Sequence, residues 1–241
     1  MNDVTICNLA LGHLGDIANV KSINPPDQSV QAQLCKRFYP AARNALLEMS
    51  SWGFATVRAK LAQVGNPTLA IAQGVDPAAT QGTWQFAYAL PNDVINVISV
   101  LPAEAIDDYE ARFWPFDQTS FPPFPQGYVP VPGALAYTPQ PFVMETLADG
   151  TQIILTNACN GVLRFTRAVT DTTKYSPLFS LALSHFLASM LAGPLIKGET
   201  GAAEAKQQLA LFKAVEGWAE ASDANQRKLN IEPSPSWIRG R

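Results

Sequence analysis

The sequence predicts an α+β protein in which an antiparallel helical bundle, built from both ends of the chain, carries an inserted antiparallel β domain. Apolar residues recur at helical spacing up to Phe54 and again after Ser176, whereas the segment between them alternates as strands do. A helix with one apolar stripe is stable only when another element covers that stripe. We therefore expect the helical segments at the two ends to cover each other.

Two helices are expected before Phe54. Asn2 or Asp3 can cap the first, and Gly15 can end it in the left-handed conformation. Asp27 or Ser29 can cap the second after a Pro-Pro turn. The expected apolar stripes are Ile6, Leu9, Ala10, Leu14 and Ile17 in the first helix, and Leu34, Phe38, Ala42, Ala45, Met49 and Trp52 in the second.

Pro40 lies in the middle of the second predicted helix. Proline cannot donate the backbone hydrogen bond to the carbonyl of Lys36, so we expect a kink or a split at this position.

The middle of the chain predicts strands. Residues 84–90 alternate between apolar and polar, and Val94 to Leu101 is β-branched and apolar after a Pro-Asn-Asp turn. Phe142 to Leu147, Thr151 to Thr156 and Val162 to Val169 follow, separated by Asp-Gly and Asn-Gly dipeptides that suit tight hairpins. We expect these last three segments to pair consecutively as antiparallel strands.

The segment 112–141 holds eight of the nineteen prolines and is not expected to form regular structure. Its aromatic side chains need a surface to cover them. That surface is either the protein's own sheet or a neighbouring subunit or tail component. The candidate contact residues are Phe113, Trp114, Phe116, Phe121, Phe124 and Tyr128.

Two more helices are expected towards the C-terminus. Ser176-Pro177 predicts a cap and first turn, and Leu178 to Leu191 is apolar on nearly every side, which is typical of a central buried helix. Gly193 to Gly201 is expected to be a turn. The next helix, Thr200 to Lys228, has a predicted stripe of Leu209, Phe212, Val215 and Ala219.

These segments predict a bundle domain of residues 1–60 and 172–230, an inserted β domain of residues 61–171 and an extended tail of residues 231–241. The tail has no core of its own, so we expect a partner to hold it. Trp237 and Ile238 are its candidate apolar anchors, and Arg239 and Arg241 its candidate partners for acidic groups.

The composition narrows the possible functions. Charged residues make up 15% of the chain, and a surface with so few charges favours assembly with other subunits. The net charge of -3 offers no basic face for tight DNA binding. Cys7, Cys35 and Cys159 are odd in number and scattered, which argues against a disulfide framework or zinc site. The start lacks a secretion signal, and the 14-residue run from Leu178 is too short to span a bilayer.

The sequence offers few parts for catalysis. It contains no phosphate-binding, dinucleotide-binding, metalloprotease or nucleophile-elbow motif, and its two histidines, His13 and His185, are interpreted as core residues rather than as ligands or a pH switch. An acidic cluster could supply the paired carboxylates of a polysaccharide or cell-wall hydrolase, although we favour the simpler interpretation of a solvated acidic loop. Its members are Glu104, Asp107, Asp108 and Glu110. We expect neither a cofactor nor a metal.

Several pieces of the sequence, in this order, resemble one known family. They are ICNLALGHLGDI from Ile6, SVQAQLC from Ser29, FYPAARNALL from Phe38, WGFA from Trp52, YALPND from Tyr88, RFTRAVTD from Arg164 and YSPLFSLALSHFLA from Tyr175. Together they resemble the tail tubular protein A family, the head-to-tail adaptors of short-tailed bacteriophages. The resemblance extends from Ile6 to about Leu195.

The resemblance implies a non-enzymatic virion protein that is assembled in the host cytoplasm. It implies a ring, expected to hold about twelve copies, between the portal protein and the tail nozzle, with tail fibres as a further contact and double-stranded DNA passing through without specific binding. It places the tail residues Trp237 to Arg241 at the portal and the aromatic arm Phe113 to Tyr128 at the nozzle or a neighbour. The alternative left open is a carboxylate-dependent hydrolase or a carbohydrate-binding tail protein.

Overall fold

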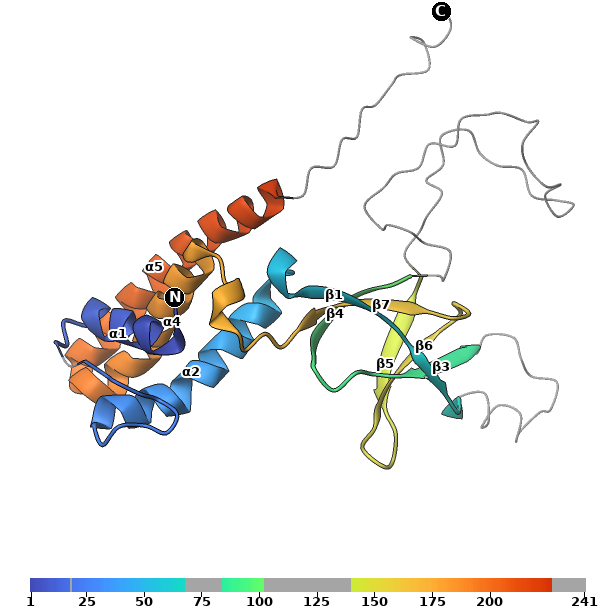
Figure 1. Ribbon diagram of the computed structural model, residues 1–241, viewed down its shortest axis with the longest axis horizontal. Helices are drawn as coiled ribbons and strands as arrows, with labels where there is room; N and C mark the ends of the chain where they lie inside the picture. The colour runs from blue at the N-terminus through green and yellow to red at the C-terminus, as the bar shows by residue number, and fades with distance from the viewer. Residues whose placement is uncertain (18, 68–83, 102–139, 227–241) are drawn as a thin grey trace, which may run out of the picture. The chain divides into compact units, whose positions relative to one another are not determined.

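The protein contains helices and two antiparallel sheets and is therefore α+β, as predicted (Figure 1). The computed structural model describes residues 1–17, 19–67, 84–101 and 140–226. They form two compact units, which we describe separately. Unit 1 comprises Met1–Val57, Asn92–Ile98 and the described part of Phe165–Arg227, and unit 2 comprises the described parts of Arg58–Pro91 and Ser99–Arg164.

The first helix, α1 (Asp3–His13), begins and ends as its sequence predicts. The Asn2 side chain accepts a hydrogen bond from the backbone N–H of Thr5 at 2.7 Å, which satisfies one of the free donors of the first turn. Gly15 has a φ of 74°, and the N–H groups of Gly15 and Asp16 return to the carbonyls of Gly12 and Leu11. This Schellman arrangement closes the helix. Ile17 lies beyond it and is exposed, so its predicted place in the apolar stripe is wrong.

The second helix, α2 (Val30–Met49), is capped by Ser29, whose hydroxyl accepts a hydrogen bond from the N–H of Ala32 at 3.1 Å. One helix runs through Pro40, so of the two predicted alternatives, a kink or a split, the split does not occur. Pro40 and Lys36 are both exposed, so water can satisfy the carbonyl that loses its partner.

The buried face of α2 differs in phase from the predicted stripe. Leu34, Phe38 and Ala45 are only partly buried and Met49 is exposed, whereas Ala42 and Trp52 are buried as expected. The fully enclosed face is centred about one residue away from the predicted stripe. Its buried residues are Ala32, Cys35, Tyr39, Ala42, Leu46 and Leu47.

The central apolar helix, α4 (Pro177–Ile196), is longer than predicted. It continues through Gly193 and Pro194, and α5 (Gly198–Asn225) follows after Lys197 alone, which has a φ of 61°. The predicted turn between two helices is therefore present within Gly193–Gly201, but it is confined to Lys197. By length and composition α4 could cross a membrane, but half of its most apolar 18-residue window is buried inside the protein, as in the core helix of a globular domain.

Helix α4 is the centre of unit 1, where it packs against α5, α1 and α2 (Figure 1). All four helices contribute to one hydrophobic core. The predicted stripe of α5 is buried at Phe212, Val215 and Ala219, but Leu209 is 36% exposed and does not belong to it. The short 3-10 segments η1 (Gly53–Ala55) and η2 (Thr172–Lys174) complete this unit.

Four aromatic side chains of this core pack on one another. Trp52 and Phe54 come from the segment after α2, and each contacts the ring of Phe179 edge-on, with centroids 5.0 and 4.9 Å apart. Tyr175 lies 4.9 Å from Phe179 and donates a hydrogen bond from its hydroxyl to the carbonyl of Val169. Such pairs stabilise a core beyond their buried area by about 0.5–1.5 kcal/mol each.

The seven described strands form two sheets. β1 (Thr56–Lys60), β7 (Val162–Arg167) and β4 (Val94–Leu101) pair in the order β1-β7-β4. The second sheet has the order β2-β3-β6-β5. Its strands are β2 (Ala62–Val64), β3 (Phe86–Ala89), β5 (Phe142–Thr146) and β6 (Gln152–Thr156).

One predicted strand pairing is wrong. β5 and β6 form the expected hairpin around Gly150, whose φ is 87°, but β7 does not pair with β6 and joins the other sheet. Asn160, with a φ of 52°, and Gly161 do turn the chain. A Cβ added to Gly161 would lie 3.5 Å from side chains of Leu61, Tyr88 and Val100, so the turn packs closely between neighbouring strands. An Asn-Gly dipeptide specifies a turn without specifying the partner of the next strand.

Leu187 and Leu209 provide a test of this core. Leu187 is fully buried on α4, whereas Leu209 is partly exposed on α5. We expect Leu187→Ala to lower the free energy of unfolding by about 2–5 kcal/mol, through lost burial and a cavity. Leu209→Ala should change it by about 0.5 kcal/mol or less. Urea denaturation of both variants measures the difference, and equal losses would contradict the assignment of the two faces.

Candidate contact surfaces

The residues predicted to contact partners all lie outside the described residues. This holds for the tail residues Trp237, Ile238, Arg239 and Arg241, for the arm residues Phe113, Trp114, Phe116, Phe121, Phe124 and Tyr128, and for the acidic cluster Glu104, Asp107, Asp108 and Glu110. Their predicted roles stay predictions. The described residues nevertheless contain two exposed apolar surfaces that were not predicted.

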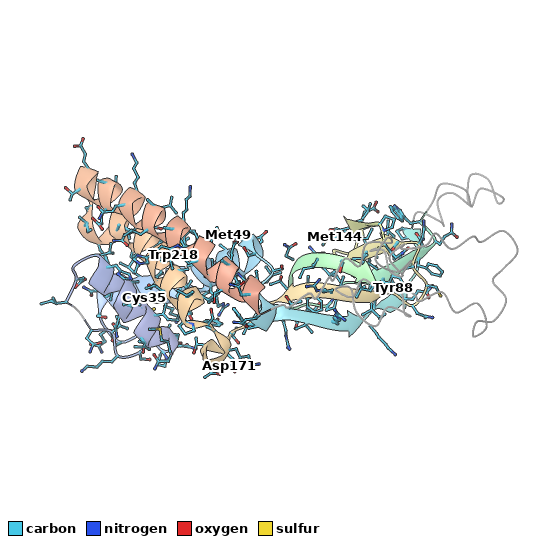
Figure 2. The ribbon with its side chains drawn as sticks, turned by 90° about the horizontal axis from the view of Figure 1, so that it is seen from above. Cys35, Met49, Tyr88, Met144, Asp171 and Trp218 are labelled. Atoms are coloured by element: carbon cyan, nitrogen blue, oxygen red, sulfur yellow. The ribbon has the colours of Figure 1, made fainter. Side chains whose placement is uncertain are left out.

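The first surface is the outer face of α5, defined here as Ala203, Gln207, Ala210, Ala214, Gly217, Ala221 and Ala224 with the flanking Leu211 and Trp218. Every one of these residues is exposed, and none carries a charge. Trp218 is 64% and Leu211 42% exposed; Figure 2 labels Trp218 on this helix. They follow a heptad pattern, with spacings of three and four residues along one side of the helix. The sequence contains a signal for this surface, namely an uncharged stripe on the side of the helix opposite Phe212 and Val215.

The second surface is the outer strand of the four-stranded sheet. In the described strand order β5 pairs with β6 alone and stands at one edge. Val143 and Met144 point to opposite faces, as successive strand residues do, and both are exposed; Figure 2 labels Met144. The predicted aromatic arm, residues 112–141, ends directly before this strand. An exposed apolar edge is a surface that another chain segment or subunit can extend.

The two histidines meet inside unit 1, where they join three helices. The rings of His13 on α1 and His185 on α4 stack with centroids 3.9 Å apart and an angle of 12° between their planes. The buried Gln208 on α5 lies 2.8 Å from His185 Nδ1, through its Oε1, and donates from Nε2 to the backbone carbonyl of His13 at 3.2 Å. The prediction of hydrogen-bonded structural histidines is consistent with this geometry.

The hydrogen-bond network identifies one ring nitrogen of each histidine that carries a proton. The Gln208 amide nitrogen also donates to Glu204 at 2.8 Å, so its oxygen must accept from His185, which therefore carries its proton on Nδ1. The Ser184 hydroxyl donates to the carbonyl of Leu181, so it accepts from Nε2 of His13. Burial, and then the nearby His185, lower the pKa of His13 below its usual 6.5.

The thiols of Cys7 on α1 and Cys35 on α2 lie against each other in the core, which their distance in sequence did not predict. A hydrogen bond to Cys35 and burial raise the pKa of the Cys7 thiol far above its usual value, so it stays protonated at neutral pH. Cys159, in unit 2, is exposed. All three are free thiols.

A small cleft of about 240 Å³ lies between the end of α2 and the end of α5. Its lining joins the two segments through hydrogen bonds: the Ser50 hydroxyl donates to Glu220, and the backbone N–H of Gly53 donates to Asp223 at 3.0 Å. These polar groups hold the segment after α2 against α5. We interpret the cleft as a feature of this packing and not as a binding site. Among the described residues, no group of three or more His, Cys, Asp or Glu side chains could hold a metal ion.

Comparison with known proteins identifies no family for this chain. No protein-family model matches the chain, and no curated protein matches it. A functional hypothesis must therefore stand on the sequence resemblance and on the residues described above.

Cysteine reactivity tests the two thiol environments. Under native conditions we expect a thiol reagent to label Cys159 alone and quickly, because Cys7 and Cys35 are buried. In denaturant all three should react. Rapid native labelling of Cys7 or Cys35, counted by mass spectrometry, would show that the helices open far more readily than this core implies.

The histidine pair makes the stability depend on pH in a defined direction. Because the pKa of His13 is lower in the folded than in the unfolded chain, the unfolded chain binds the extra proton more readily, and stability falls as the pH drops below about 6.5. His13→Gln keeps a donor towards Ser184 but does not titrate. We expect the wild type to lose more thermal stability than this variant between pH 7.5 and 5.5. Equal losses would contradict the role of His13.

Proposed function

We propose that this chain is a structural subunit of the head-to-tail adaptor of a short-tailed bacteriophage. In this proposal about twelve copies form a ring that joins the portal to the tail nozzle and lines part of the DNA ejection conduit. The protein acts in the neck of the virion, has no catalytic role and needs no cofactor. DNA passes through without specific binding.

The observation that carries the proposal is where the resembling pieces lie. WGFA contributes Trp52 and Phe54, and YSPLFSLALSHFLA contributes Tyr175 and Phe179; these are the four rings that pack together in unit 1. Pieces separated by more than a hundred positions in the sequence thus share one core.

A second pair of resembling pieces also meets. ICNLALGHLGDI contributes His13, and the last piece contributes Ser184 and His185, which form the stacked histidine pair and its hydrogen bond. These contacts support the finer architecture of the proposal, a bundle built from residues 1–60 and 172–230 around an inserted β domain of residues 61–171. These contacts support the fold that the resemblance implies. They do not test the proposed partners.

The exposed surfaces suit an assembled subunit. A ring requires that one face of each subunit meet a different face of its neighbour. The edge strand β5 exposes the apolar side chains of Val143 and Met144, which is typical of a surface that another protein covers. In the proposal the tail residues 231–241 engage the portal, and the aromatic arm engages the nozzle or a neighbour.

Native mass spectrometry of the chain mixed with the portal ring of the same phage tests the proposal. We expect the full chain to add about one copy per portal subunit and a version truncated after Asn230 to add none, because the truncation removes Trp237 and the two arginines. Circular dichroism of the truncated chain controls for folding. If the full chain ignores the portal, the adaptor proposal fails, and assays of sugar binding and hydrolysis, with Glu104 and Asp108 substituted, become the next test.

A further inference from the structure

We propose that the outer face of α5 binds the same face of α5 in a second copy of this chain, as an antiparallel helix pair. The observation behind the proposal is a solvent-facing helix surface with no charge, flanked by Trp218 and Leu211 at 64% and 42% exposure. Large apolar side chains grouped on one exposed helix face are typical of an interaction surface.

The centre of the face permits close approach of two helices. Ala210, Ala214, Gly217 and Ala221 occupy successive positions of its heptad stripe, and each has a side chain no larger than a methyl group. A Cβ added at Gly217 would meet nothing within 4 Å in the single chain. The stripe from residue 207 to residue 224 is roughly 27 Å long at 1.5 Å per residue, which is enough for several layers of contact.

The charges beside the stripe select the partner and the direction. On one flank, Lys206, Lys213 and Glu220 follow one another at intervals of seven residues, and all three are exposed. When two identical helices pair antiparallel, each flank faces the same flank of the partner. If Ala214 lies opposite Gly217 of the partner subunit, Lys213 lies beside Glu220 of the partner subunit. The two-fold symmetry produces this opposite-charge pair twice.

The same register matches the other flank. It places Leu211 of one copy beside Trp218 of the partner subunit, and Trp218 beside Leu211 of the partner subunit. The two most exposed large apolar side chains of this face therefore cover each other without any further adjustment. One register thus satisfies the small residues, the charges and the apolar side chains together.

Other arrangements of the same two faces fit less well. Shifting the antiparallel pair by one heptad places Lys206 beside Glu220 of the partner subunit, but it also places Lys213 opposite itself and Trp218 opposite Glu204 of the partner subunit, so the apolar side chains no longer cover each other. A parallel pair forms no opposite-charge contact on either flank and places Glu199 beside Glu204 of the partner subunit, which is repulsive. In the single chain Glu220 also accepts a hydrogen bond from Ser50, which holds its carboxylate in an exposed position while leaving acceptor sites for a lysine.

This contact goes beyond the adaptor function. It closes on two copies, whereas a ring uses two different faces of each subunit. The two proposals can therefore fail separately: the mass of the free chain tests the helix pair, and portal binding tests the adaptor.

Sedimentation equilibrium of the full chain over a range of concentrations tests the pair. We expect a monomer–dimer equilibrium in the wild type. Lys213→Glu and Glu220→Lys should each weaken dimerisation by about tenfold or more, because each change turns two attractive contacts into two repulsive ones. The double variant K213E/E220K should recover most of the affinity lost by either single variant.

Two further variants complete the test. Trp218→Ala should also weaken the dimer, whereas Lys36→Glu, at an exposed position on α2 and not on this face of α5, should change its dissociation constant by about twofold or less. Circular dichroism confirms that each variant is folded. A wild-type chain that stays monomeric, a dimer unaffected by Lys213→Glu, or a double variant no better than the single ones would overturn the proposal.

Discussion

The burial of α4 is the constraint on which unit 1 depends. This helix contains no charged residue and is apolar on nearly every side, so it cannot face water along its length. α1, α2 and α5 each cover part of it. Since α1 and α2 come before the strands in the sequence and α5 comes after them, the core can form only when distant parts of the chain have met. The helical unit is thereby a product of long-range contacts rather than of local helix propensity.

Two kinds of contact fix how these helices meet. The aromatic group around Phe179 is apolar and belongs to the hydrophobic core, while the histidine pair is polar and directional. Gln208 contributes to this precision because its amide can satisfy His185, the carbonyl of His13 and Glu204 only in one orientation. Buried polar networks that are fully satisfied specify one arrangement of a core. The resembling sequence pieces supply both kinds of contact, which links the family hypothesis to the physical stability of the unit.

Much of the fold could be predicted from the sequence, because local signals are strong there. Asn2, Gly15, Ser29 and Ser176-Pro177 mark helix boundaries through backbone hydrogen bonds that are local in the chain. The pairing of β7 could not be predicted, since it depends on which distant strand is free. The strands β1 and β2 were missed because they are short and follow directly after a helical segment. The exact buried face of α2 depended on which neighbours cover it.

Some candidate contact residues could be recognised only from the structure, whereas others are predicted from the sequence alone. Trp218 and Leu211 stand out once α5 has a known buried side, because a large apolar residue is notable only when it faces away from the core. The predicted arm and tail residues rest on the sequence alone.

Electron microscopy of the chain assembled with its portal ring tests most directly the proposal that this chain is a head-to-tail adaptor. We predict a twelvefold ring of this chain stacked on the portal, with unit 1 folded around α4. A chain that binds without rotational symmetry, or not at all, would contradict it.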